Sequence, residues 1–425
     1  MNVLVVGGGA REHAICWALR RELGGGELFA APGNSGTAML ATNLPIGSTD
    51  IDRLVSATAA HSIDLVVIGP EAPLAEGLAD RLRASGRPVF GPSSEAARIE
   101  SSKAFAKEVM AKANVPTASS RTFTELELAL AWVDRLDPPI VVKASGLAAG
   151  KGVIICQTKA EAQRTTTGML RDNTFGEAGR TVIIETFLEG EELSVMAMTN
   201  GEDLLLLPPA QDHKRLLDGD KGPNTGGMGA YSPVSIATRI LLDKVERIIL
   251  RPTLNELARR GAPFSGVLYA GLMLDRAGSP KVIEFNCRLG DPEAQTIIPR
   301  IRSGLVEAFH ACAVGAPLPK VEVLPLGAVT TVVATEGYPT DPRLGDVIEF
   351  DPIPESTLIW HGSTQSDQRG ALRTNGGRVF AVTGLAEDIL EAQRASIVGA
   401  EAIRFEGKQF RRDIGWREAK RITGA

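Results

Sequence analysis

The chain has 425 residues, of which 44% are hydrophobic and 23% charged, and its formal net charge is −5. This is the composition of a soluble globular protein, and the length predicts three or four domains at about 100–200 residues each. A charge this mild leaves no electrostatic footprint for nucleic acid or for an anionic membrane, so we expect neither as a partner.

The four cysteines, Cys16, Cys156, Cys287 and Cys312, lie far apart and form no Cys-x-x-Cys pair. This spacing predicts neither a zinc ribbon nor a disulfide framework, and it fits a reducing compartment. The first apolar segment is too short for a signal-peptide core, and no run approaches the roughly 18 apolar residues of a membrane span. We therefore expect a cytoplasmic protein.

The first hundred residues alternate short apolar strands with helical segments. We predict strands at 3–6, 28–31, 65–68 and 89–90, and helices at 11–21, 72–83 and 94–99. This alternation predicts a parallel α/β sheet, whose ligands bind beyond the carboxyl ends of the strands. Glycine-bearing turns follow Val6, Ala31 and Ile68, and all three lie at those ends.

The first of these turns, Gly7 to Glu12, is similar to the start of a dinucleotide-binding fingerprint. Glu12 stands where the fingerprint requires its third glycine, so NAD binding and a dehydrogenase activity are disfavoured. The amide groups and the helix N-terminus still suit a phosphate, and Arg11 would add a charge-assisted contact.

The rest of the chain divides into a lid-bearing section and a small closing section. A helix at 101–113, capped by Ser101 or Ser102, precedes an α/β lid at about 118–189. Long strands at 266–274 and 281–287 follow, with a helix at 237–260 that Pro252 should kink. A proline-rich linker at 316–319 leads to strands at 328–334 and 378–382 and a helix at 386–398. We predict domains at 1–100, 101–325 and 326–425, with mixed α/β and α+β folds and a β-rich C-terminal domain.

Residues 140–155 form two β-branched runs around a loop that contains Gly146, Gly150, Lys151 and Gly152. This pattern predicts a hairpin whose tip can bring backbone N–H groups close to a phosphate, although a mobile turn would look the same. It is not a P-loop, because Lys151 is followed by Gly152 and another strand instead of by Ser or Thr and a helix.

A second polar pattern interrupts the apolar strand at 282–287. Because side chains alternate along a strand, Glu284, Asn286 and Arg288 should share one face. The side chains of Ile283 and Phe285 should then be buried on the opposite face. Carboxylate and amide oxygens suit Mg²⁺, which is usually completed by water and substrate phosphates. An edge strand with a solvated polar face is the alternative.

Together the two segments resemble the ATP-grasp superfamily, and within it the glycinamide ribonucleotide synthetase family. The resemblance covers nearly the whole chain. It is carried by GGGAREHA (7–14), APGNSGT (31–37), GPEAPL (69–74), GLAAGKG (146–152), QDHKR (211–215), GPNTGGMGAYSP (222–233) and TNGGR (374–378).

The resemblance implies an ATP-dependent ligase of purine biosynthesis that uses Mg²⁺ or Mn²⁺. In such a reaction glycine is joined to 5-phosphoribosylamine through glycyl phosphate, with release of ADP and phosphate. Two alternatives stay open: a carboxylase that activates bicarbonate at the same nucleotide site, and a sensor that binds ATP without turnover. We expect small-molecule substrates only, and a monomer.

The resemblance also implies roles for individual residues. Arg288 and Lys151 would be catalytic, and Glu284 and Asn286 would hold the metal. Glu192 would hold the ribose, although the sequence leaves Glu191 open. The implied nucleotide-binding residues are Lys103, Lys143, Gly146, Gly150, Lys151, Gly152, Glu185, Phe187, Leu188 and Glu192.

On the acceptor side, Asp212 and Lys214 resemble lining residues, and Asp212 would hold the glycine ammonium group. A ribosyl phosphate suits the N-terminal turns better than a pyrophosphate does. The predicted contacts of that group are Gly9, Arg11, Asn34, Gly69 and Glu71, whose backbone N–H groups would do most of the binding.

We expect His13 and His213 to be structural, because an acyl phosphate and a free amine need little proton transfer before the tetrahedral stage. Two positions depart from the family pattern. Leu272 stands where many relatives have a carboxylate, and Ser145 where an aspartate is usual.

Overall fold

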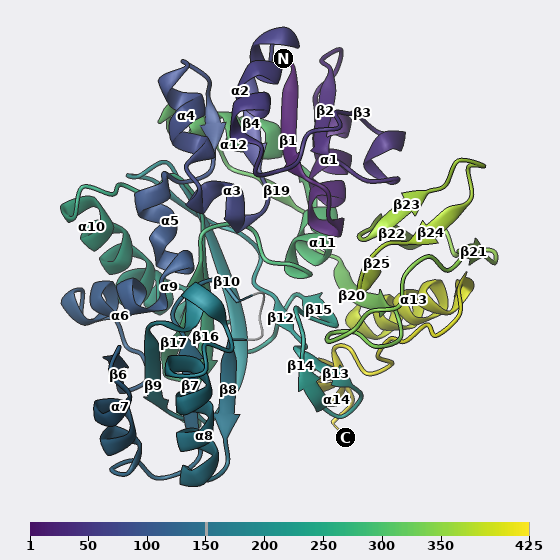
Figure 1. Ribbon diagram of the computed structural model, residues 1–425. Helices are drawn as coiled ribbons and strands as arrows, with labels where there is room; N and C mark the ends of the chain where they lie inside the picture. Colours follow the sequence, from purple (N-terminus) through teal and green to yellow (C-terminus); the bar gives the residue numbers. More distant parts are fainter. Residues whose placement is uncertain (149–151, 425) are drawn as a thin grey trace.

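The computed structural model describes residues 1–148 and 152–424. Figure 1 shows the N-terminal domain at the top, a small sheet with two helices at the lower left and the C-terminal domain at the right. In the described part of the chain, no helix combines the length and the apolar character needed to cross a membrane.

The N-terminal domain contains the predicted parallel sheet, with strand order β3-β2-β1-β4-β5. Its strands are β1 (Val3–Gly7), β2 (Leu28–Pro32), β3 (Thr42–Asn43), β4 (Leu65–Ile68) and β5 (Val89–Phe90). The helices are α1 (Ala10–Glu22), α2 (Ile51–Ala60), α3 (Glu71–Ala75), α4 (Leu78–Ala84) and α5 (Ser94–Ser101). The prediction of a single helix at 72–83 is wrong, since Gly77 lies between α3 and α4 at φ 86°, where a helix cannot continue.

The central domain is built on an antiparallel sheet of order β11-β10-β16-β17. Its strands are β10 (Glu191–Thr199), β11 (Leu204–Leu206), β16 (Gly266–Leu274) and β17 (Pro280–Asn286). In the pairing of β16 with β17, Gly271 lies opposite Glu284 and the next residue, Leu272, lies opposite Val282. The register therefore shifts at this point, and Ile283 has no partner on β16. This bulge breaks the strict alternation that the sequence predicts, and bulges of this kind are common beside active sites.

Two helical predictions in this domain need adjustment. The helix predicted at 101–113 is α6 (Lys103–Lys112), and Ser102 caps it by accepting the N–H of Phe105 at 3.3 Å. The segment predicted at 237–260 comprises α9 (Arg239–Val245), a π-helical turn (Glu246–Leu250) and α10 (Arg251–Arg259). The distortion lies in the turn before Pro252, because proline removes an N–H donor and its ring crowds the preceding turn.

The lid is a separate antiparallel sheet of order β6-β9-β7-β8. It consists of β6 (Ser120–Phe123), β7 (Ile140–Ala144), β8 (Val153–Cys156) and β9 (Val182–Thr186), with α7 (Leu126–Val133) and α8 (Lys159–Leu170). Strands β7 and β8 pair from Ile140 opposite Cys156 to Lys143 opposite Val153, which confirms the predicted hairpin.

The C-terminal sheet has the order β12-β15-β20-β25-β22. Its strands are β12 (Gln211–Asp212), β15 (Gly229–Ser232), β20 (Gly327–Ala334), β22 (Thr357–His361) and β25 (Arg378–Ala386), and α13 (Ile389–Ala402) packs against β20 and β25. Strands β12 and β15 come from the section that we assigned to 101–325, so the central section contributes to this sheet as well. Asp212 therefore lies where the central and C-terminal sheets meet.

The remaining elements lie around these sheets. The helices are α11 (Glu293–Ile297), α12 (Leu305–Val314) and α14 (Trp416–Thr423). Four two-stranded ribbons are β13 (Arg215–Leu217) with β14 (Lys221–Asn224), β18 (Ile301–Ser303) with β19 (Glu322–Val323), β21 (Glu349–Phe350) with β26 (Ile403–Arg404), and β23 (Thr364–Ser366) with β24 (Leu372–Thr374).

Candidate active site

A cleft of about 860 Å³ opens where the three domains and the lid meet. Its lining includes many of the predicted site residues: Arg11, Glu71, Lys103, Lys143, Gly152, Glu185, Phe187, Leu188, Glu192, Asp212, Lys214, Glu284, Asn286 and Arg288. Gly9, Asn34, Gly69 and Gly146 lie outside this lining, and Gly150 and Lys151 fall outside the described residues.

Strand β17 presents the two predicted metal ligands to the cleft. Glu284 and Asn286 lie opposite Gly271 and Tyr269, and both side chains line the cleft while Phe285 is buried. The expected burial of Ile283 is wrong, because the bulge turns this half-buried residue toward the cleft. Its carbonyl oxygen accepts a hydrogen bond from Lys143 Nζ at 3.1 Å.

The Glu284 carboxylate is surrounded by basic groups. Burial alone would favour its neutral form, but the charges of Lys214, Lys143 and Lys103 hold the pKa of Glu284 below its ordinary value. The carboxylate is therefore ionised at neutral pH, as a ligand of a hard cation must be.

The donor set fits Mg²⁺ or Mn²⁺ only in part. Glu284 and Asn286 offer oxygen ligands, and within 1–148 and 152–424 no group of three or more His, Cys, Asp or Glu side chains could hold a metal ion. The two residues would therefore hold a cation that takes its other ligands from water and phosphate oxygens, which is usual for Mg²⁺.

Lys143 and Glu185 form the core of the lid side of the cleft. Lys143 Nζ lies 3.0 Å from Glu185 Oε2, and Lys107 Nζ lies 2.9 Å from Oε1 of the same carboxylate. The carboxylate of Glu185 is thus the counter-ion of two lysines. Sequence reasoning missed Lys107, although it follows Lys103 by four residues and so shares its helix face.

Lys103 begins α6 beside the glycine-bearing hairpin. Its Nζ donates to the carbonyl oxygen of Gly146 at 3.3 Å, and burial lowers the pKa of this lysine. The hydroxyl of Ser145 accepts the N–H of Ala104 at 3.1 Å, while the carbonyl of Ser145 accepts the N–H of Lys103 at 2.9 Å. Ser145 therefore attaches the hairpin to α6, which gives this unusual residue a physical role.

Arg288 lies between two carboxylates. Its Nε is 3.2 Å from Glu71 Oε2, and its Nη2 is 2.8 Å from Glu100 Oε1. Burial opposes the charge, but the two glutamates raise the pKa of Arg288 above its ordinary value. Sequence reasoning missed Glu100, because a glutamate near the end of a surface-type helix gives no sign that it reaches a strand end far along the chain.

On the acceptor side, Lys214 Nζ lies 2.9 Å from Glu192 Oε2 and 3.7 Å from Glu284 Oε1. Burial raises the pKa of Asp212 well above its ordinary value, and Lys214 only partly offsets this effect. Among the described residues the buried Oδ1 of Asp212 has no hydrogen-bond partner. An orphaned buried acceptor of this kind suits a ligand with N–H donors.

Glu191 and Glu192 differ in their partners, although both line the cleft. Glu192 pairs with Lys214, whereas Glu191 accepts from Gln211 Nε2 at 2.8 Å and pairs with Arg421 of α14. The assignment of Glu192 to the ribose stays a prediction.

At the first N-terminal turn, the carboxylate of Glu12 contacts Gly9 and Arg11. Its Oε2 accepts the N–H of Gly9 at 2.7 Å, and its Oε1 lies 2.7 Å from Nε of Arg11. A side chain at Gly69 would collide with the same carboxylate. Glu12 thus occupies the position next to the N–H of Gly9, and the predicted ribosyl phosphate contacts at Gly9, Arg11 and Gly69 stay predictions.

Asn34 joins the N-terminal and C-terminal domains. Its Nδ2 donates to the carbonyl oxygens of Gly8 at 2.9 Å and His361 at 2.7 Å, while its Oδ1 accepts the N–H of Gly36 at 2.8 Å. Both ends of this side chain are thus engaged within the chain itself, and its predicted substrate contact stays a prediction.

The C-terminal domain also reaches the cleft through the 374–378 motif. Arg378 Nη2 lies 2.7 Å from Asp291 Oδ2, and its Nη1 donates to the carbonyl oxygen of Gly226 at 2.8 Å. This ion pair joins two motifs that are 87 positions apart, so sequence spacing could not have revealed it.

Leu272, the other departure from the family pattern, and the two histidines also have structural explanations. Leu272 is fully buried, whereas its neighbour Met273 lines the cleft, so an acid at position 272 would not face the site. Burial lowers the pKa of His13 and of His213 to about 3, which keeps both imidazoles neutral at pH 7.

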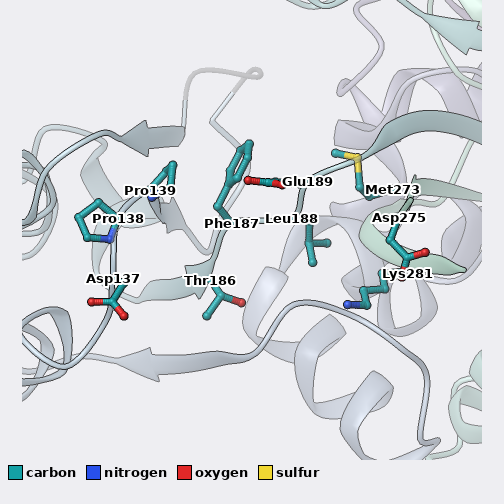
Figure 2. A pocket seen from close by; sticks show the side chains of 10 residues that line it. All are labelled: Asp137, Pro138, Pro139, Thr186, Phe187, Leu188, Glu189, Met273, Asp275 and Lys281. Carbon is teal, nitrogen blue, oxygen red and sulfur yellow. The ribbon is translucent and has the colours of Figure 1, made fainter. Parts of the chain in front are cut away.

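A second hollow of about 300 Å³ lies behind the hinge, residues 187–190, which joins β9 to β10. Figure 2 shows Thr186 and Leu188 on the side of the hinge opposite Phe187, with Lys281 approaching that side from β17. Thr186, Phe187, Leu188 and Met273 line both this hollow and the main cleft, so the hinge is the wall between them.

Models of the phosphoribosylglycinamide synthetase family match three consecutive parts of the chain. The N domain matches residues 1–100, the ATP-grasp (A) domain 101–294 and the C domain 328–417. The chain belongs to the phosphoribosylglycinamide synthetase family. The family model of the ATP-grasp domain and the structure together confirm the predicted architecture.

Individual relatives agree with this family assignment. The chain is 46% identical to the phosphoribosylamine–glycine ligase of Vibrio cholerae over 427 residues, which covers 99% of each chain. A crystal structure of phosphoribosylamine–glycine ligase from Thermotoga maritima superposes with a TM-score of 0.85 at 36% identity, covering 97% of this chain and 100% of that one.

The fold extends beyond the phosphoribosylglycinamide synthetase family. The biotin carboxylase domain of a 2-oxoglutarate carboxylase from Hydrogenobacter thermophilus has a TM-score of 0.74 at 17% identity, covering 96% of this chain and 91% of that one. That structure contains MgADP and bicarbonate. At this identity the likeness shows a shared fold and nothing about the substrate of this family member.

The lowered pKa of Glu284 predicts how metal binding depends on pH. A carboxylate with a lowered pKa is charged above its ordinary pKa of about 4.5 and is protonated only further below it. Mn²⁺ binding in the presence of ADP, followed by electron paramagnetic resonance, should therefore show no inflection from Glu284 between pH 8 and pH 5.5. Glu284→Gln should weaken Mn²⁺ binding by about tenfold or more across that range.

The exposed Glu95 supplies the control, and Glu95→Gln should bind Mn²⁺ as the unaltered protein does. An inflection near pH 6 that disappears in Glu284→Gln would contradict the charge assignment.

Proposed function

We propose that the protein is a phosphoribosylamine–glycine ligase that forms glycinamide ribonucleotide, ADP and phosphate in purine biosynthesis. The observation that carries the proposal is the strand end Glu284–Arg288, where two oxygen ligands and a guanidinium line one cleft beside Lys143, a buried lysine of the lid. Membership of the phosphoribosylglycinamide synthetase family supports it.

In the first step, we propose that the glycine carboxylate attacks the γ-phosphate of ATP, the bond between that phosphorus and the bridging oxygen breaks, and glycyl phosphate and ADP form. Two anions must approach one another, so the site has to neutralise charge as the phosphoryl group moves. Lys103 and Lys143 would bind the phosphate oxygens from the lid side. A divalent cation held by Glu284 and Asn286 would supply further charge neutralisation at the β- and γ-phosphates.

Arg288 would orient the glycine carboxylate and stabilise the acyl phosphate. In the second step the amine of 5-phosphoribosylamine attacks the carbonyl carbon, the C–O bond to phosphate breaks and the nitrogen loses a proton. Asp212 would accept hydrogen bonds from the glycine ammonium group through its unpartnered oxygen. Glu71, next to Arg288, would face the phosphoribosylamine.

The remaining assignments concern the nucleotide and the hairpin. Phe187 and Leu188 of the hinge would bind adenine, and Glu192 would bind the ribose. The hairpin that carries Gly146 and Gly152 would close over the phosphates, because acyl phosphates hydrolyse readily and water must be excluded. Lys151 lies outside the described residues, and its catalytic role stays a prediction.

We further propose that the protein acts as a cytoplasmic monomer. All four cysteines are free and buried, as in proteins of a reducing compartment. Size-exclusion chromatography with light scattering would test the oligomeric state, and a dimer would contradict it.

The function is tested by phosphate release from the purified protein with ATP and Mg²⁺. We expect release that depends on both glycine and phosphoribosylamine. Release that follows bicarbonate and ignores glycine would favour a carboxylase instead. Tight ATP binding with no phosphate release under any of these conditions would favour a nucleotide sensor.

Two substitutions should separate the acyl side from the phosphate side. Arg288→Ala should lower kcat by about 100-fold or more, with little change in ATP affinity, because Arg288 would act after the nucleotide is bound. Lys143→Ala should chiefly raise the Kd of ATP, since a phosphate contact is lost. Calorimetry with a non-hydrolysable ATP analogue, together with steady-state kinetics, measures both effects. Equal losses of kcat and ATP affinity in Arg288→Ala would contradict its place on the acyl side.

A further inference from the structure

Glu100 is a buried acid to which the proposed mechanism gives no part. It lies in the last turn of α5, is 8% exposed and lines the cleft. A buried carboxylate is costly unless its oxygens are hydrogen bonded or paired. The contacts of both oxygens are therefore informative.

Each oxygen of Glu100 holds a different part of the strand end that follows β17. Its Oε2 accepts the backbone N–H of Cys287 at 2.8 Å, and its Oε1 pairs with Arg288 Nη2 at 2.8 Å. Cys287 lies between Asn286 and Arg288 and just after the end of β17. One carboxylate thus fixes both the backbone between these two side chains and the guanidinium itself.

The other contacts of Arg288 leave one nitrogen for a substrate. Its Nε pairs with Glu71, and its Nη2 also donates to Asn286 Oδ1 at 3.3 Å. Its Nη1 donates only to the carbonyl oxygen of Leu289, at 3.2 Å. Among the described residues Nη1 is therefore the terminal nitrogen without a carboxylate partner. Glu100 and Asn286 both hold the opposite terminal nitrogen, and the shorter, charged contact is the one to Glu100. Glu100 therefore contributes most to this orientation, because a charge-assisted hydrogen bond is stronger than one to a neutral amide.

The same short stretch also reaches the phosphate side. Lys103 follows Glu100 by three residues, and its Nζ contacts the carbonyl oxygen of Gly146 in the hairpin. The junction of α5 and α6 therefore fixes the acyl-side guanidinium at one end and a phosphate-side lysine at the other.

We propose that Glu100 is a positioning residue that presents the Nη1 edge of Arg288 to the carboxylate of the amino acid substrate. This inference rests on the proposed function, because it assigns Arg288 to the acyl side. The substrate class at this edge is a small amino acid whose carboxylate becomes an acyl phosphate.

Glu100→Gln tests the proposal because it keeps the shape and removes one acceptor. An amide has one oxygen, so its NH₂ group must face either the Cys287 N–H or the Arg288 guanidinium, both of which are donors. We expect a fall in kcat of about tenfold or more and a rise in the KM of glycine. The Kd of a non-hydrolysable ATP analogue should not change.

A double-mutant cycle separates positioning from a general structural role. When Arg288 is already Ala, Glu100→Gln should cause little further loss, because the glutamine oxygen can still accept the Cys287 N–H and nothing remains to be oriented. Glu100→Asp keeps the charge but is too short to reach both partners, so its kcat and glycine KM should change in the same direction. This variant also provides a second measurement if Glu100→Gln folds poorly.

Glu256 offers a matched control. This residue of α10 is 6% exposed and is not among the residues that line the cleft. Its carboxylate pairs with Nε of Arg260 at 2.9 Å. Glu256→Gln should leave kcat and the glycine KM unchanged.

Two results would overturn the inference. One is a Glu100→Gln protein with unaltered kcat and glycine KM, and the other is a full additional loss in the Arg288→Ala background. An unaltered protein that binds ATP but releases no phosphate with glycine would overturn the proposed function first, and the role of Glu100 with it.

Discussion

The site depends on the charge balance around one carboxylate. Glu284 lies near the end of β17 among Lys103, Lys143 and Lys214, whose charges keep it ionised despite its burial. The same lysines repel a bare divalent cation, so the cation gains most when a polyphosphate is present to neutralise them. The geometry therefore favours the binding of metal and nucleotide as one complex. Two protein ligands would then be enough, because phosphate oxygens and water would complete the coordination of a cation held by Glu284 and Asn286.

The rest of the architecture brings other charges to this strand end. The lid supplies Lys143, which is neutralised by Glu185, and the N-terminal domain supplies Glu71 and Glu100 on either side of Arg288. The C-terminal domain contributes through Arg378, which pairs with Asp291 just beyond the same strand. All three domains thus hold one short segment, and the cleft between them separates a phosphate side from an acyl side.

Sequence reasoning predicted the parts of the fold that local patterns determine. The parallel N-terminal sheet, the hairpin at 140–155 and the polar face of β17 follow from strand periodicity and glycine placement. The bulge at Ile283 could not be predicted, since it depends on the register with β16. Glu100 and the Arg378–Asp291 pair were missed because each contact spans a long stretch of chain, and a single sequence contains no signal for such pairs. For the first turn, the sequence analysis predicted only that Glu12 replaces a glycine of the dinucleotide-binding fingerprint. It did not predict that the Glu12 carboxylate accepts the N–H of Gly9.

The central claim is that Glu284 and Asn286 hold a cation only together with a nucleotide. A crystal structure with Mn²⁺ and a non-hydrolysable ATP analogue, analysed by anomalous scattering, tests it most directly. The account predicts one anomalous peak bound to Glu284, Asn286 and phosphate oxygens, and a much weaker peak or none in crystals soaked with Mn²⁺ alone. A peak away from β17, or equal occupancy without the nucleotide, would contradict the account.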